Sequence, residues 1–110
     1  MSLDIYFISR KNVLCPHCNT VVKTEDVYET GSSGRDWYEI LELIGYYVPY
    51  DKRTEENNWY GKDMVLTAEQ TKQVYDFIKK NPDLYNARDV IGLIATAILD
   101  ENAIVINANW

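Results

Sequence analysis

The feature that most constrains the fold is the tetrapeptide Cys15-Pro16-His17-Cys18, which contains both cysteines and the only histidine of the chain. Apolar pairs, Val13-Leu14 and Val21-Val22, stand on either side of it. A Cys-Pro-x-Cys turn between apolar pairs is typical of a metal knuckle that closes a β-hairpin, because both thiolates lie on one side of the turn. The sequence therefore predicts a hairpin with a zinc-binding turn, around which the rest of the chain is arranged.

A structural zinc ion takes four ligands, and one Cys-x-x-Cys pair supplies two of them. His17 lies inside the same tight turn, and its side chain would have to fold back to reach the same ion. Asp4 on the first predicted strand and Asp36 at the start of the first predicted helix are better candidates. We therefore expect structural zinc on Cys15, Cys18, Asp4 and Asp36. The alternatives are one imidazole and one carboxylate as the further ligands, ligands from a partner chain, or a degenerate turn without metal.

A disulfide or a redox pair fits the two cysteines less well. Residues 1–10 lack the pattern of a signal peptide, so we expect a cytoplasmic protein with reduced thiols. A redox Cys-x-x-Cys motif opens a helix in a βαβ unit, whereas β-type residues follow Cys18. No apolar run approaches the roughly 20 residues of a membrane helix, so we expect no membrane contact.

Residues 1–110 are predicted to form a single domain, long enough to bury a core without disulfides. Residues 3–8 are rich in β-branched and aromatic side chains and predict a strand, followed by a polar turn at 9–12. With the cysteine hairpin, they predict a small antiparallel sheet over residues 1–30. Residues 31–34 predict a flexible break, and residues 103–107 predict a C-terminal strand that pairs with the N-terminal sheet.

Residues 36–101 predict a helical part with three helices. Asp36 and Glu39 indicate a capping box for a helix over 36–44, and Thr67 and Gln70 indicate another for a helix that ends near residue 80. Asn86 is expected to cap the third helix, over 87–100. The apolar stripe predicted for the third helix is Val90, Ile91, Ile94, Ala95, Ile98 and Leu99. The fold class predicted is α+β, a zinc-knuckle sheet packed by about three helices.

The charge is uneven along the chain. Residues 1–35 hold four acids and four bases, whereas residues 36–110 hold thirteen acids and seven bases, which accounts for the net charge of −6. An acidic surface repels phosphate, so we expect no direct nucleic-acid binding. The same surface can dock on a basic protein, although its simplest role is solubility.

Residues 46–62 predict a long ordered loop with several aromatic side chains, which either anchor a protein interface or fill the core. The residues predicted to bind a partner combine the acids and aromatics of this loop with two acids of the first helix. They are Glu39, Glu42, Tyr47, Tyr50, Asp51, Glu55, Glu56, Trp59 and Tyr60.

Catalysis has little support in the sequence. A hydrolytic zinc site usually takes two or more ligands from histidine, and a cysteine nucleophile needs a separate general base. The only histidine lies inside the cysteine turn, and neither common Gly-rich phosphate loop is present. We therefore expect no enzymatic activity.

The chain resembles a family of small, mostly uncharacterised proteins encoded by phages and prophages, over roughly its first half. The resemblance lies in Leu3-Asp4-Ile5-Tyr6, the cysteine turn, Val27-Tyr28-Glu29, and a helix that ends in Gly45-Tyr46-Tyr47. The family pattern Asn-x-Thr-His-Asn falls on residues 32–36, where Arg35 occupies the histidine position. The resemblance therefore implies that a third metal ligand is missing there, or that Asp36 takes its role.

Small size, negative charge and a phage origin also make the chain similar to anti-CRISPR proteins, specifically inhibitors of Cas9. This similarity implies a metal-stabilised, non-enzymatic inhibitor in the cytoplasm of an infected bacterium. Such an inhibitor blocks DNA loading by binding the positively charged nucleic-acid channel of its host protein. Two alternatives stay open, a nucleic-acid-binding zinc module that uses Arg10, Lys11 and Lys23, and a phage structural or assembly protein.

Overall fold

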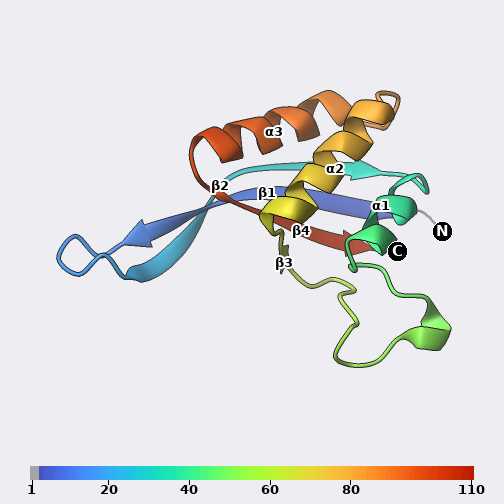
Figure 1. Ribbon diagram of the computed structural model, residues 1–110, viewed down its shortest axis with the longest axis horizontal. Coiled ribbons are helices and arrows are strands. Elements are labelled where there is room, and N and C mark those ends of the chain that lie inside the picture. Colours follow the sequence, from blue (N-terminus) through green and yellow to red (C-terminus); the bar gives the residue numbers. More distant parts are fainter. Residues whose placement is uncertain (1–2) are drawn as a thin grey trace.

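The fold is a four-stranded antiparallel sheet with helices on one face (Figure 1). The structure is a computed structural model and describes residues 3–110. The strands are β1 (Asp4–Leu14), β2 (Val21–Ser33), β3 (Met64–Val65) and β4 (Ala103–Asn109), in the order β2-β1-β4-β3. The helices are α1 (Trp37–Leu43), α2 (Ala68–Lys80) and α3 (Ala87–Leu99), with a 3-10 turn, η1 (Tyr50–Lys52). The predicted α+β class is confirmed.

Strand β1 is central to the sheet and pairs with β2 on one side and β4 on the other. The predicted C-terminal strand is confirmed, since β4 pairs with β1 from Asp4 opposite Asn109 to Arg10 opposite Ala103. Side chains alternate between the two faces of a strand, so the apolar side chains of these strands gather on one face, which packs beneath the helices. The side chains buried there include Ile5, Phe7, Ile104, Ile106 and Ala108.

Two segments predicted as breaks are strand instead. The expected turn at residues 9–12 lies inside β1, and most of the expected break at 31–34 lies inside β2, paired with the start of β1. The polar residues 9–12 break the apolar alternation that marks a half-buried strand. From Lys11 onward both faces of the hairpin are largely exposed, so these residues are held in a strand by backbone pairing and not by burial against the helices.

The outer part of the β1–β2 hairpin extends beyond the helices as a two-stranded arm, which we define as residues 10–26 (Figure 1). Almost every side chain of β2 within the arm is exposed. The arm contributes to the elongated shape of the molecule, which measures 48 × 33 × 22 Å. Because two strands alone are marginal in water, the end of the arm depends on further contacts for order.

Helix α1 buries the apolar residues that recur at i, i+3, i+4 and i+7 in its sequence, which are Trp37, Ile40, Leu41 and Ile44. The Trp37 ring packs at 5.3 Å from that of Phe7. The predicted capping box is wrong, because Asp36 makes no side-chain cap hydrogen bond. Its backbone is already helical, with φ −63° and ψ −18°, whereas a capping side chain needs an extended backbone.

The capping box of α2 is confirmed. The Gln70 amide N–H donates to the Thr67 hydroxyl at 3.1 Å, and the Thr67 amide N–H donates to the Gln70 side-chain oxygen at 2.9 Å. Thr67 has the extended backbone that this arrangement needs, with φ −71° and ψ 168°.

Helix α3 differs from its prediction in two ways. Asn86 has a left-handed backbone and makes no cap hydrogen bond, and its side-chain N–H donates instead to Thr30 and Gly31 of β2. The buried stripe is Ala87, Val90, Leu93, Ile94 and Ala97, and the predicted core residues Ile98 and Leu99 are exposed. Because most residues from Val90 to Leu99 are apolar, the sequence does not distinguish one stripe from the next.

Candidate functional site

The cysteine turn closes the β1–β2 hairpin at the tip of the arm, as predicted. The Cys15 amide N–H donates to the Thr20 carbonyl at 2.8 Å, and the Asn19 amide N–H donates to the Cys15 carbonyl at 3.0 Å. Asn19 has a left-handed backbone with φ 55°, a conformation that asparagine tolerates well. These contacts hold Cys15 and Cys18 on one short turn, with Cys18 exposed to solvent.

The local contacts favour a thiolate at Cys18. Its sulfur lies 2.9 Å from the Thr20 hydroxyl. Hydrogen bonds from the Thr20 hydroxyl, the Thr20 backbone and the Cys15 side chain lower the pKa of Cys18 to about 7. Since the thiolate is the form that binds metal and attacks electrophiles, Cys18 is prepared for both kinds of chemistry.

The predicted carboxylate ligands lie far from the cysteines. Asp4 begins β1 opposite Ser33, whereas the cysteine turn follows Leu14 at the other end of that strand. At about 3.3 Å per residue, the 11 residues of β1 span roughly 35 Å. Asp36 follows Ser33 closely in sequence and lies at the Asp4 end. The predicted set of two cysteines and these two aspartates therefore does not meet within one chain, because residues 9–12 continue the strand instead of turning back.

Within residues 3–110, no group of three or more His, Cys, Asp or Glu side chains is close enough to hold a metal ion. The acids of the arm are engaged in ion pairs, Glu25 with Lys23 at 2.9 Å and Asp26 with Arg10 at 2.8 Å. The cysteine turn therefore brings together two of the four ligands that a structural zinc ion needs, Cys15 and Cys18, and no third among residues 3–110.

The residues predicted to bind a partner lie at the end of the molecule opposite the cysteine turn (Figure 1). Glu39 and Glu42 are on α1, and the others are on the loop between α1 and β3. All five acids are exposed, and none forms an ion pair within the part of the chain that the structure describes. These five acids, Glu39, Glu42, Asp51, Glu55 and Glu56, are hereafter called the acidic end.

The aromatic residues of the loop divide between core and surface. Tyr47 packs edge-on against Tyr38 at 4.9 Å and Trp110 at 5.1 Å, and Trp59 packs against Tyr46 at 6.3 Å. In contrast, Tyr50 is 87% exposed and Tyr60 is 46% exposed. Of the four aromatics predicted to bind a partner, only these two present a large surface to solvent.

The bases proposed for a nucleic-acid site are mostly paired with carboxylates. Arg10 donates to Asp26 at 2.8 Å and to Asp63 at 3.1 Å, and these contacts raise the pKa of Arg10 further. Lys23 pairs with Glu25. Two of the three positive charges near the cysteine turn are thus neutralised by neighbours, which weakens the case for a phosphate-binding surface.

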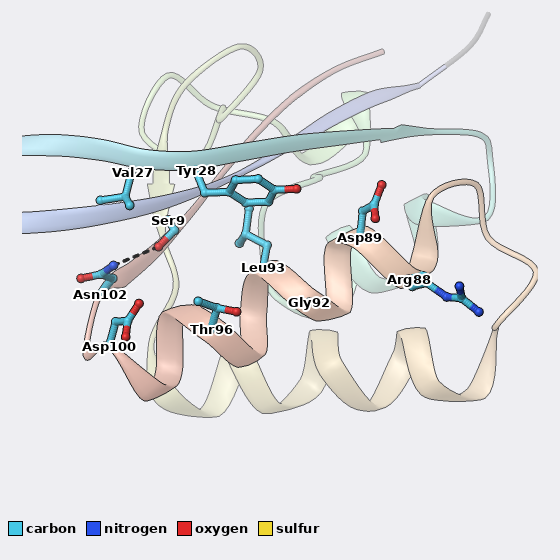
Figure 2. Close-up of a pocket in the computed structure, with 10 residues that line it drawn as sticks. All are labelled: Ser9, Val27, Tyr28, Arg88, Asp89, Gly92, Leu93, Thr96, Asp100 and Asn102. Carbon is cyan, nitrogen blue, oxygen red and sulfur yellow. Dashed lines mark hydrogen bonds between the residues drawn. The ribbon is translucent and has the colours of Figure 1, made fainter.

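A groove between β2 and α3 was not predicted from the sequence. Figure 2 shows Tyr28 of β2 above the α3 face that carries Gly92, Leu93 and Thr96. The groove has a volume of about 380 Å³, and the Asn102 side-chain N–H donates to Ser9 at 3.2 Å at one end. The small residues Gly92 and Thr96, four apart on one helix face, are the only sequence signal for it. Their position opposite β2 depends on the sheet.

No helix within residues 3–110 is long and apolar enough to cross a membrane. The candidate residues predicted from the sequence lie on two separate surfaces, the cysteine turn at the arm tip and the acidic end beside α1. Comparisons of the chain with protein-family models, with curated proteins and with solved structures find no match.

Proposed function

We propose that this chain is a non-enzymatic inhibitor that binds a host protein with a basic nucleic-acid channel, such as a Cas9-like nuclease, in the cytoplasm of an infected bacterium. The observation that supports this proposal best is the acidic end. It presents five exposed carboxylates without ion pairs in the described residues, on α1 and the adjoining loop. Carboxylates in this condition are available to the Lys and Arg side chains of a partner.

The physics of association favours this use of the acidic end. Complementary charge raises the association rate and fixes orientation, whereas aromatic anchors supply most of the binding energy. Tyr50 and Tyr60 belong to the same loop as three of the acids and are exposed. A channel that normally holds a nucleic-acid duplex is lined by positive charge, so it is a suitable surface for this combination.

The zinc ion belongs to this proposal as a structural element of the arm. Cys15 and Cys18 are its ligands in this chain, and the thiolate form favoured at Cys18 supports that role. Because the cysteine turn and the acidic end lie at opposite ends of the molecule, the metal orders the arm and not the surface that binds the nuclease.

The test is a DNA-binding and DNA-cleavage assay with a purified Cas9–guide complex and increasing amounts of this chain. We expect inhibition near one chain per nuclease, before target DNA is bound, and weakening as salt is added. The variants E39K/E42K and D51K/E55K should each weaken inhibition at least about tenfold, as expected when like charges replace attractive ones.

The matched control is D83K/D89K, which makes the same charge change at two exposed acids near the start of α3. It should inhibit as well as the unaltered chain. Equal loss of inhibition in control and test variants would show that net charge matters and the acidic end does not. An absence of binding to the nuclease complex would contradict the proposed partner.

A further inference from the structure

We infer that the cysteine turns of two copies meet tip to tip and hold one zinc ion between them, with Cys15 and Cys18 of each copy as its four ligands. The inference rests on the zinc proposed above and is independent of the nuclease partner. It assigns the cysteine turn a second function, which is to join two copies of this chain.

The first argument is the number of ligands. Structural zinc is bound in tetrahedral geometry by four protein ligands, and sulfur-rich sets are common. The turn offers two thiols, and no third His, Cys, Asp or Glu joins them among residues 3–110. Asp4 lies roughly 35 Å away, at the other end of β1, and Asp36 follows Ser33, the strand residue opposite Asp4. An identical turn from a second copy supplies the two missing thiolates.

The second argument is access. The turn lies at the tip of the arm, beyond the helices that cover the sheet (Figure 1). Cys18 is exposed and Cys15 is partly exposed. A second tip can therefore approach without a collision between the two helical layers. A two-fold axis through the metal would make both copies use the same surface, which is the commonest symmetry of soluble dimers.

The third argument is the apolar surface around the cysteines. Leu14, Val21 and Val22 are 51%, 53% and 61% exposed. Three apolar side chains exposed together at the end of an extended hairpin are unfavourable in an isolated chain. When two tips meet, these side chains cover one another and add apolar burial to the metal bonds.

The fourth argument is charge. Four thiolates around one zinc ion carry a net charge of −2, which favours positive surroundings. The arm, residues 10–26, contains three bases, Arg10, Lys11 and Lys23, and two acids, Glu25 and Asp26, which pair with Lys23 and Arg10. Each arm therefore carries a net charge of +1, and the two arms together offset part of the negative charge that the metal centre creates.

The test measures mass and metal together. The reduced chain is freed of metal, titrated with zinc in a reducing buffer, and followed by light scattering after size-exclusion chromatography. We expect a dimer that forms as zinc is added, is complete at one zinc per two chains, and dissociates with a chelator. Cobalt in place of zinc should give the absorption spectrum of tetrahedral coordination by four thiolates.

Two variants distinguish a zinc ion shared between two copies from a zinc ion bound within one chain. C18S should lose the zinc-dependent dimer while keeping the thermal unfolding of the metal-free chain. D4N/D36N should keep the dimer, because these carboxylates lie at the far end of β1. One zinc bound per monomer would overturn the inference, as would a dimer that persists in chelator. If C18S still inhibits the nuclease, the proposed inhibitor function stands whether or not the zinc bridge does.

Discussion

Ser32 illustrates how one side chain joins three parts of the fold. Its hydroxyl accepts a hydrogen bond from the indole N–H of Trp37 at 2.9 Å and donates to the backbone carbonyl of Tyr85, just before α3. Ser32 itself is only 6% exposed. Ser32 belongs to a segment whose sequence predicts a flexible break, yet it is a core residue that connects β2, α1 and the start of α3.

The variant S32A should therefore destabilise the protein. It leaves the buried indole N–H of Trp37 without its partner, which costs about 1–3 kcal/mol of unfolding free energy. Urea denaturation measures this loss. The matched control is S33A, whose side chain points to the opposite face of β2 because strand residues alternate. An equal effect of both variants would contradict the role given to the Ser32 hydroxyl.

A second prediction for a single residue concerns how the rate of Cys18 alkylation depends on pH. The thiolate of Cys18 is the form that reacts with iodoacetamide, and the pKa of Cys18 is about 7. The rate of Cys18 alkylation should therefore be half-maximal near neutral pH in metal-free protein. T20V removes the hydroxyl that contributes most to the lowered pKa, so the midpoint should move to higher pH. Tandem mass spectrometry distinguishes Cys18 from Cys15. T24V, in the adjoining strand, should leave the midpoint unchanged.

Among the secondary-structure elements, α1 and α2 begin in different ways although their sequences predict the same capping box. Thr67 and Gln70 form both hydrogen bonds of the box, whereas Asp36 forms none. The difference follows from the residue before each helix, since Thr67 is extended and Asp36 is already helical. A capping motif therefore identifies where a helix begins more reliably than which side chain caps it.

This difference predicts unequal effects of two alanine variants. T67A should lower the unfolding free energy by about 1 kcal/mol, the usual cost of losing a capping side chain. D36A should change it by less than about 0.5 kcal/mol, as at other surface positions. Chemical denaturation of both variants measures the difference, and a large effect of D36A would show that Asp36 does cap α1.

The elements that the sequence predicts best are those whose packing leaves a local pattern. The stripe of α1, the capping box of α2 and the apolar run of β4 follow from local periodicity and capping chemistry. The arm was predicted less well, because polar residues exposed on both faces carry no alternation. The two residues of β3 are too few to leave a pattern.

The candidate site was also predictable only in part. The spacing of Cys15 and Cys18 places both in one hairpin turn, and the structure agrees. The remaining ligands were not predictable, because they depend on how far β1 continues before it turns. Had residues 9–12 formed a turn, Asp4 would lie much closer to the cysteines.

The whole molecule consists of a packed body with its two candidate surfaces at opposite ends. Apolar burial is concentrated where α1, α2 and α3 cover the sheet, and the arm adds little to it. This separation allows each surface to be altered without disturbing the other. It also means that the cysteine turn contributes little to the stability of the body in the absence of metal.

The double variant C15S/C18S should consequently keep the unfolding free energy of the metal-free chain within about 0.5 kcal/mol, as for exposed substitutions remote from the core. Urea denaturation in chelator measures it. I106A is the opposite control, because Ile106 is fully buried and its truncation should cost about 2–5 kcal/mol. A marked loss in the double variant would show that the turn supports the body even without metal.

The central position of β1 in the sheet also affects when the chain can fold as it leaves the ribosome. β1 is synthesised before both of its neighbours; β2 follows closely, but β4, which pairs Phe7 with Ile106, follows much later. Until residues 103–109 leave the exit tunnel, the edge of β1 that pairs with β4 has no hydrogen-bonding partner, and the apolar face of β1 is incompletely covered. Folding of the body therefore cannot be completed before residues 103–109 have left the tunnel, and until then the nascent chain is exposed to aggregation or chaperone binding.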